Sequence, residues 1–363
     1  MVDIPFALSG NNELRSCKNN TIYIFPILIM NLNRFIFKLL LILLVLLLLQ
    51  CVFYLILPQE FPAIVNMLSK ELQKENDIVG FGDSSVYFHA KEDDIDKSIF
   101  KILSGFYPQL SLHEFNSPAY HLDLYENMIR FFIAEHKNVK ILIIPINMRS
   151  FSPQWNMNPG YQFEEENIAM KNYNNWIFRV FYKPLAVFKL FLPKIKDHDY
   201  NNAIVYNGDK AVGRVKEFLS RRYSDWKSEK YIKDKFIFHY MYSLGKEHRK
   251  ISSMLRINKM AKLNNINVIF YVTPIDYESG NKAVGPEFQR RINDNVSVIK
   301  KIASKEGFDI IDLSLTLKAS YFSWRTDLKG DFSPNEHLID KGRLFVANKL
   351  KEKIDFIFDG GLH

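Results

Sequence analysis

The chain has 363 residues, of which 47% are hydrophobic, and a formal net charge of +8. This composition is that of a globular protein with one large domain or two ordinary ones. The basic residues are spread along the chain without a block of five or six, and no zinc-finger spacing or aromatic RNA-binding motif is present. We therefore expect no nucleic-acid partner.

An uncharged apolar run of 19 residues stands near the N-terminus, at residues 39–57. Its length matches the ~20 residues that a helix needs to cross a bilayer. Four basic residues precede it: Arg15, Lys18, Arg34 and Lys38. The positive-inside rule then places the N-terminus in the cytoplasm and the rest of the chain outside. A cleaved signal peptide is the alternative, but the run is long and no A-x-A-like site follows it.

We therefore expect three parts: a cytoplasmic tail at 1–34, a transmembrane anchor at 35–57 and one domain at 58–363. The protein would be a single-pass protein of the inner or plasma membrane, with its C-terminal domain outside the cytoplasm. The first 29 residues show no regular pattern and are expected to be unstructured, with Met30 as an alternative start.

Beyond the anchor, continuous apolar runs bounded by polar residues, Gly or Pro predict buried strands. The runs are Ile78–Gly82, Val139–Ile146, Val268–Thr273, Phe308–Leu313 and, more weakly, Leu110–Phe115. Segments with helical spacing lie between them: Asp94–Leu103, Tyr120–Glu135, His248–Leu263 and Glu287–Glu306. The alternation predicts an α/β three-layer sandwich with a mainly parallel sheet, whose chemistry gathers at the carboxyl ends of the strands.

The alternation breaks at about residues 155–245, which we interpret as a mainly helical insertion. Within it, Trp176–Lys196 is aromatic and basic and contains no acidic residue. Two interpretations remain open. The segment either packs its aromatic residues on the main domain or rests on a membrane surface or an integral-membrane partner.

The first strand ends in Gly82-Asp83-Ser84-Ser85. A serine at the carboxyl end of a strand, ahead of a helix, places its hydroxyl at the reactive edge of the sheet, where backbone N–H groups can stabilise an oxyanion. The alternative is that Ser84 or Ser85 only caps the next helix. Asp83 is not expected to be the catalytic acid, because adjacent side chains tend to point apart.

Two further groups follow later strands. Asn147 comes after Val139–Ile146, where a neutral amide can donate to developing negative charge, or can simply begin a loop. Arg149 could bind an anionic group of a substrate or pair with an acid. His337 stands after the last strand in a polar loop with Asp331 and Glu336, as a base that is oriented by an acid would require.

In this order, Gly82-Asp83-Ser84, Asn147 and His337 with Gly342 resemble the blocks of the SGNH (GDSL-like) hydrolase superfamily. The resemblance covers residues 77 to about 352, with the 155–245 insertion outside it, and implies an SGNH or flavodoxin-like sheet. It also implies Ser84 as the nucleophile and His337 as the base. The oxyanion would be held by Asn147, the Ser84 amide and a block-two amide.

The chain departs from the family pattern at two places. Pro334 stands where an aspartate is expected, so Asp331 is the favoured acid and Glu336 the fallback. The block-two glycine is missing from residues 115–121, so the backbone amide of Asn116 or Ser117 would take its place. Asn116, Ser117 and Arg149 are also expected to contact substrate. We interpret His89 and His121 as structural or substrate-contacting residues.

No metal-ligand spacing, Walker loop or dinucleotide fingerprint is present, so no metal or cofactor is expected. The resemblance implies a serine esterase or O-acyltransferase that acts on acyl groups of an envelope polysaccharide through an acyl-serine. An integral-membrane acyltransferase would be a further partner. The alternative is a catalytically inactive scaffold or glycan-binding protein of the same fold, which the two departures favour.

Overall fold

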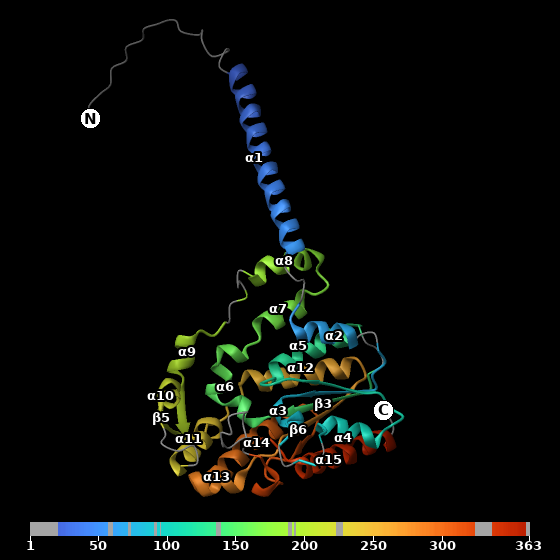
Figure 1. Ribbon diagram of the computed structural model, residues 1–363, viewed down its shortest axis with the longest axis vertical. Helices are drawn as coiled ribbons and strands as arrows, with labels where there is room; N and C mark the ends of the chain where they lie inside the picture. Colours follow the sequence, from blue (N-terminus) through green and yellow to red (C-terminus); the bar gives the residue numbers. More distant parts are fainter. Residues whose placement is uncertain are drawn as a thin grey trace, which may run out of the picture.

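The computed structural model describes residues 21–56, 61–71, 74–90, 93–94, 96–135, 139–187, 191, 194–222, 228–323 and 336–360. A single long helix, α1 (Thr21–Ile56), projects from a folded domain (Figure 1). It begins at Thr21, within the part of the chain that was expected to be unstructured. Its segment Leu32–Phe53 has a mean hydropathy of 2.9, is not buried by the rest of the described chain, and is long and apolar enough to span a membrane.

The domain is built around one five-stranded sheet. Its strands are β1 (Ile78–Gly82), β2 (Leu112–Asn116), β3 (Ile141–Ile146), β6 (Asn267–Val272) and β7 (Ile310–Asp312). They lie in the order β2-β1-β3-β6-β7, and every neighbouring pair is parallel. The carboxyl ends of all five strands therefore meet at one edge.

Helices cover both faces of the sheet. On one face lie α5 (Leu122–Glu135) and α12 (Arg249–Leu263), and on the other lie α4 (Ile99–Phe106) and α15 (Asp340–Asp359) (Figure 1). Side chains of one strand alternate between the two cores. Leu142 and Ile144 of β3 join the first core, and Ile143 joins the second. Burial on both sides explains why the strands read as continuous apolar runs, and the predicted three-layer α/β fold is confirmed.

The remaining elements of the core domain are short helices and one long helix. They are α2 (Ala63–Glu71), α3 (Ser84–Tyr87), α13 (Tyr277–Val284), α14 (Glu287–Lys305) and the 3₁₀ turn η3 (Ala319–Tyr321). The predicted helix at Asp94–Leu103 begins later than expected, as α4, because the Ser98 hydroxyl accepts a hydrogen bond from the Lys101 amide at 3.0 Å and so caps the helix at Ile99.

The insertion between β3 and α12 contains helices and one hairpin. Its elements are η1 (Met148–Phe151), α6 (Pro153–Met157), η2 (Pro159–Tyr161), α7 (Glu164–Asn172), α8 (Trp176–Val187), α9 (Asp197–Asn202), β4 (Ile204–Asn207), β5 (Lys210–Arg214), α10 (Val215–Ser220) and α11 (Glu229–Tyr240). The antiparallel β4–β5 hairpin was not predicted. Its turn contains Gly208 at a φ of +66°, which favours glycine.

Candidate active site

Two adjacent serines at the end of β1 have different environments. Asp83 caps α3, and its Oδ1 accepts hydrogen bonds from the Ser85 amide at 2.9 Å and from the Ser85 hydroxyl at 2.6 Å. Ser85 is buried, whereas Ser84 is half-buried and its hydroxyl makes no hydrogen bond to another described residue. The capping role thus belongs to Asp83, which leaves the Ser84 hydroxyl available for chemistry.

A close approach of neighbouring strands accounts for the glycine ahead of this turn. Gly82 pairs with Asn116 of β2, and a Cβ atom on Gly82 would lie 2.3 Å from Asn116 Oδ1 and 2.9 Å from Val86 Cβ. The Ser117 amide donates to the Gly82 carbonyl at 3.3 Å. Asn116 and Ser117 therefore lie beside the strand that presents Ser84, but the Ser117 amide is engaged within the sheet.

Asn147, which follows β3, connects two buried carboxylates. Its Nδ2 donates to Asp83 Oδ2 at 2.8 Å and to Glu336 Oε1 at 3.1 Å, and its Oδ1 accepts from the Arg149 amide at 3.0 Å. The side chain thus begins the η1 turn, as the loop interpretation expects, and also bridges the two ends of the domain. The Asn147 amide, which was predicted to hold an oxyanion, donates to these two carboxylates in the structure.

The second oxygen of Glu336 is also engaged. Glu336 Oε2 accepts from Arg149 Nη1 at 3.1 Å and from the Tyr240 hydroxyl at 3.2 Å. Arg149 also lies 3.1 Å from His239 Nε2 and stacks over the Trp155 ring at 4.7 Å. We call Asp83, Asn147, Arg149, Tyr240 and Glu336 the edge network.

These contacts bear on two predicted roles. Arg149, expected to bind substrate, forms a buried ion pair with Glu336 instead, which is the alternative that the sequence left open. Glu336, the fallback acid for His337, makes its hydrogen bonds to the amide, guanidinium and phenol of the edge network. The favoured acid, Asp331, lies outside the described residues.

His337 is held at the same edge of the sheet. The imidazole is 9% exposed and stacks on Phe88, with ring centroids 4.1 Å apart and planes at 15°. The Phe88 amide donates to the Ser84 carbonyl at 3.0 Å, so the ring that supports His337 belongs to the turn that begins at Ser84. Phe88 therefore connects the turn that carries Ser84 to the loop that carries His337.

Arg343 of α15 fixes the loop that carries His337. This side chain is 0% exposed, and its Nη1 donates to the carbonyls of Phe88 at 2.9 Å and Leu338 at 2.8 Å. It also forms an ion pair with Asp93 at 2.8 Å. One guanidinium therefore joins both segments that enclose the imidazole.

Burial sets the protonation states at this edge. Burial and the nearby Glu336 charge raise the pKa of Asp83 to about 6. Burial lowers the pKa of His337 to about 4, although Glu336 opposes the effect. Burial would raise the pKa of Glu336, but Arg149 and His337 hold it below its usual value. At neutral pH the imidazole is consequently neutral and able to accept a proton.

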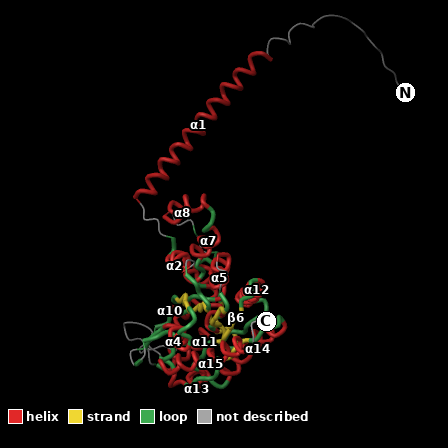
Figure 2. The backbone as a smooth tube through the Cα atoms, turned by 90° about the vertical axis from the view of Figure 1, so that its right-hand side faces the viewer, coloured by secondary structure: helices red, strands yellow, loops and turns green. Residues whose placement is uncertain are grey.

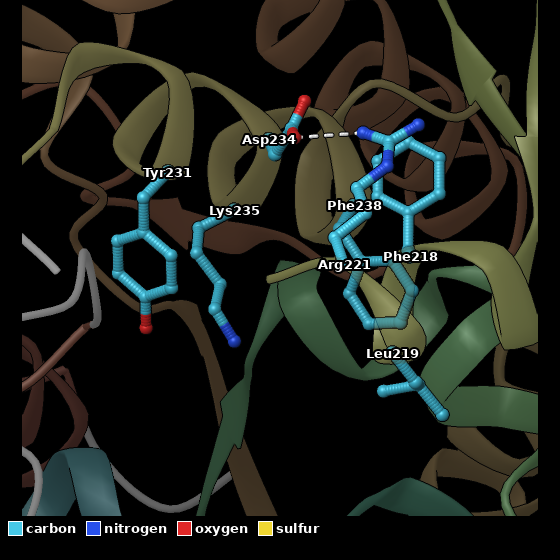
Figure 3. Close-up of a pocket in the computed structure, with 7 residues that line it drawn as sticks. All are labelled: Phe218, Leu219, Arg221, Tyr231, Asp234, Lys235 and Phe238. Carbon is cyan, nitrogen blue, oxygen red and sulfur yellow. Dashed lines mark ion pairs between the residues drawn. The ribbon is translucent and has the colours of Figure 1, made fainter. Parts of the chain in front are cut away.

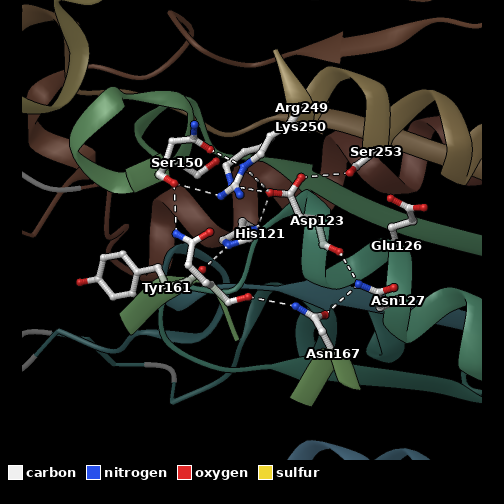
Figure 4. A network of polar contacts seen from close by, with 12 residues as sticks. His121, Asp123, Glu126, Asn127, Ser150, Tyr161, Asn167, Arg249, Lys250 and Ser253 are labelled. Carbon is white, nitrogen blue, oxygen red and sulfur yellow. Dashed lines mark hydrogen bonds and ion pairs between the residues drawn. The ribbon is translucent and has the colours of Figure 1, made fainter. Parts of the chain in front are cut away.

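The other two histidines noted in the sequence lie in polar contacts elsewhere. His89 Nε2 is 2.9 Å from Asp96 Oδ1. His121 is buried, with Nε2 2.7 Å from the Tyr161 carbonyl, beside a second polar network (Figure 4). Among the described residues, no group of three or more His, Cys, Asp and Glu could hold a metal ion.

The second polar network joins α5 to α12. Asp123 accepts from Lys250 Nζ at 3.2 Å and from the Ser253 hydroxyl at 3.0 Å, and Glu126 forms a two-bond pair with Arg256 at 2.8 Å for each bond. We call these five residues the clasp network. It fastens the two helices that cover one face of the sheet.

A pocket of about 170 Å³ lies in the insertion, between α10 and α11 (Figure 3). Its lining residues are Phe218, Leu219, Arg221, Tyr231, Asp234, Lys235 and Phe238. Helix α11 links this pocket to the edge network, because Lys235 lines the pocket and Tyr240, further along the helix, bonds Glu336. Burial and the Arg149 charge lower the pKa of Lys235.

Several residues at the site were not found from the sequence. Tyr240 and His239 come from the insertion and have no local signal. Arg343 did have a signal in the sequence, because it occupies a core-facing position of a helix whose Val346, Ala347 and Leu350 are buried. A charged residue on an otherwise apolar face indicates a buried, fully bonded group.

No family model matches the chain, and no curated protein matches it. Solved structures do resemble it. An acylhydrolase candidate of Bacteroides fragilis NCTC 9343 is 10% identical, with a TM-score of 0.38 over 82% of this chain and 98% of that protein. The acetylxylan esterase Axe2 of Geobacillus stearothermophilus is 13% identical, with a TM-score of 0.34 over 78% of this chain and 95% of the esterase. These likenesses, at 10% and 13% identity, concern the fold.

Proposed function

We propose that the chain is a membrane-anchored SGNH-type serine esterase or O-acyltransferase that forms an acyl-serine at Ser84. One observation carries this proposal. Of two adjacent serines at the carboxyl end of β1, Ser85 is buried and bonded to Asp83, while Ser84 is half-buried with an unbonded hydroxyl among the described residues. His337 is held beside the same turn through Phe88.

The proposed reaction begins when Ser84 Oγ attacks an ester carbonyl carbon and His337 takes the hydroxyl proton. The Ser84 amide, at the first position of α3, has no partner within the helix and can donate to the oxyanion. Asn147 can donate as well if Nδ2 turns from a carboxylate. The intermediate then expels the alcohol, which takes the proton from His337, and the acyl group passes to water or a sugar hydroxyl.

The acid that orients His337 is proposed to be Asp331. Glu336 sits immediately before the histidine, but its oxygens accept from Asn147, Arg149 and Tyr240. The edge network then has a separate task, which is to hold the ends of β1 and β3 and the His337 loop together. In this assignment Asp331 orients His337, and Glu336 serves the connection between the strands and the loop.

The proposed substrate is an acylated polysaccharide of the cell envelope. The single apolar helix near the N-terminus and the basic residues ahead of it favour an extracytoplasmic domain. The pocket beside the site presents aromatic rings and cations, with Arg221 stacked over Phe218 at 3.6 Å, and such rings suit the apolar faces of sugars. An integral-membrane acyltransferase is the proposed partner in acyl transfer.

The test uses the full chain in detergent, with p-nitrophenyl acetate and a serine-reactive fluorophosphonate. We expect the wild type to hydrolyse the ester and take up the label, and Ser84→Ala to lose both. Ser85→Ala is the matched control, because it removes a hydroxyl one position away and should keep the label. Labelling of Ser84→Ala at the wild-type rate would contradict the proposal.

A second candidate function is a non-catalytic glycan-binding scaffold. It is favoured by the engagement of the Asn147 donors with carboxylates rather than with an open oxyanion site. In that case neither serine would be labelled, and binding of an acylated glycan would be the same in the wild type and in Ser84→Ala.

A further inference from the structure

Helix α8 lies between the end of α1 and the rest of the domain in both views (Figures 1 and 2). The Gln50 side-chain amide of α1 donates to the Val180 carbonyl of α8, and Lys183 Nζ donates to the Phe53 carbonyl at 3.5 Å. Both α1 residues belong to the last turn of the apolar segment that ends at Phe53. The structure therefore ties α8 to one end of the segment that can span a membrane.

The depth of α8 relative to a bilayer follows from its contact with the end of α1. The 22 residues of Leu32–Phe53 rise about 33 Å as a helix, which matches a hydrocarbon core of about 30 Å. If this segment spans a bilayer, Phe53 lies at the boundary between hydrocarbon and headgroups. Helix α8, which bonds the Phe53 carbonyl, is then at headgroup depth.

One face of α8 is apolar and uncovered. Its exposed residues are Trp176, Ile177, Val180, Phe181 and Val187. At 100° per residue these positions fall within an arc of about 140°. The opposite face is buried against the domain, where Tyr182 stacks with Phe61 at 4.6 Å. A tryptophan that is 72% exposed beside a membrane-spanning helix is typical of the bilayer interface.

The chain from the end of α7 through α8 is basic. Residues 167–196 contain six basic residues and no acidic residue, and Arg179 is exposed on α8 itself. The preceding helix α7 carries three acids, of which two are engaged: Glu165 accepts from the Tyr182 hydroxyl, and Glu164 lies 3.8 Å from Lys194. Each basic residue near an anionic surface contributes about 1 kcal/mol to membrane binding.

We propose that the exposed face of α8 docks on the lipid interface, so that the protein contacts the bilayer through two helices instead of one. Arg179 then meets anionic headgroups, while Trp176 and Phe181 enter the boundary of the acyl chains. Two contacts fix the tilt of the domain against the bilayer plane, whereas α1 alone would leave the domain free to tilt. This inference rests on α1 crossing the bilayer and not on the activity of Ser84.

The test reconstitutes the full chain in vesicles of phosphatidylcholine and phosphatidylglycerol that contain lipid brominated near the interface, a quencher of tryptophan fluorescence. The difference between wild type and Trp176→Phe isolates the Trp176 signal. We expect brominated lipid to reduce this signal at least two-fold. The matched control is Phe356→Trp in the Trp176→Phe background, because Phe356 is 67% exposed on α15, away from α1, and its replacement should not be quenched.

Two further arms complete the test. Val180→Asp with Phe181→Asp should abolish the quenching of Trp176 without changing the circular dichroism spectrum, and phosphatidylcholine alone should give weaker quenching than the anionic mixture. Equal quenching at positions 176 and 356 would overturn the proposal. So would quenching that appears only after another membrane protein is added, which would assign this face to a protein partner, or release of the whole chain from vesicles on flotation.

Discussion

The edge network and the clasp network are both polar and each contains buried ionisable groups, but they differ in charge balance. In the edge network Arg149 pairs with one carboxylate, Glu336, while the other, Asp83, accepts from the neutral groups of Asn147 and Ser85. In the clasp network Asp123 and Glu126 meet Lys250 and Arg256, with further basic residues close by. Burial and Glu336 raise the pKa of Asp83 to about 6, whereas Lys250 and neighbouring charges outweigh burial and lower the pKa of Asp123.

This difference in charge balance indicates a functional role for the edge network and a structural role for the clasp network. A buried carboxylate without its own cation keeps an ionisation near neutral pH, which is typical of functional sites. A buried carboxylate with several cations remains ionised at all ordinary pH values and holds its partners in place. We therefore expect changes in the clasp network to affect stability and changes in the edge network to affect activity and pH dependence.

The largest expected effect is on stability, from Lys250→Met in the clasp network. The change removes a fully buried ammonium group and leaves Asp123 short of a partner, so we expect a loss of about 3–5 kcal/mol in the free energy of unfolding. Denaturant unfolding in detergent measures it. Lys259→Met, an exposed position on the same helix, is the control. Equal stability of both variants would show that the clasp network does not contribute to the free energy of unfolding.

The next effect is on catalysis, from Asn147→Ala in the edge network. The variant loses the bridge between Asp83 and Glu336 and the proposed oxyanion donor, so we expect kcat for p-nitrophenyl acetate to fall about 100-fold or more. Asn264→Ala, at an exposed loop position, should behave as wild type. A kcat within three-fold of wild type would remove Asn147 from the mechanism.

A smaller effect concerns pH. Because the pKa of Asp83 is raised to about 6 from its ordinary 3.8, folding favours the protonated form; this stabilisation is present below about pH 4 and is lost as pH rises through 6. Relative to Asp83→Asn, the wild type should therefore lose about 2 kcal/mol of stability between pH 4 and 7. His337, whose pKa is lowered, acts in the opposite direction in both proteins and cancels in the difference. Parallel pH profiles for the two proteins would refute the raised pKa.

The smallest effect comes from Phe88→Leu. It keeps an apolar side chain but removes the ring that stacks on His337, so we expect a loss of about 1 kcal/mol, or roughly five-fold in kcat/KM. Phe356→Leu, at an exposed position, is the control. A change in KM alone, with kcat unaltered, would indicate that the ring contacts substrate instead of supporting the imidazole.

The sequence predicted the sheet well because its strands are buried on both faces. Each of the five apolar runs became a strand, and the residues at the carboxyl ends of β1 and β3 reached one edge as parallel topology requires. The β4–β5 hairpin was missed although Asn207-Gly208 is a strong turn signal, because its two strands are short and largely exposed and so lack a continuous apolar run.

The contacts within the site could not be predicted in the same way. Asn147 bonds Asp83 and Glu336, which lie far away in the sequence on both sides of it, and Tyr240 reaches Glu336 from the insertion. Such partners depend on how loops pack in three dimensions, and no spacing in the sequence encodes them. The adjacency of Glu336 and His337 suggested a pairing, but no spacing indicated that the Glu336 carboxylate also bonds Asn147, Arg149 and Tyr240.

The position of Arg343 has a consequence for the timing of synthesis. The loop that carries His337 is fastened by a guanidinium from the last helix, while Ser84 begins α3, directly after the first strand of the sheet. Roughly 250 residues separate Ser84 from His337, so at 5–20 residues per second a ribosome needs about 13–50 s between them. A nascent chain therefore carries Ser84 long before His337 is made, and a chain that ends before α15 keeps His337 but lacks the guanidinium that fastens its loop.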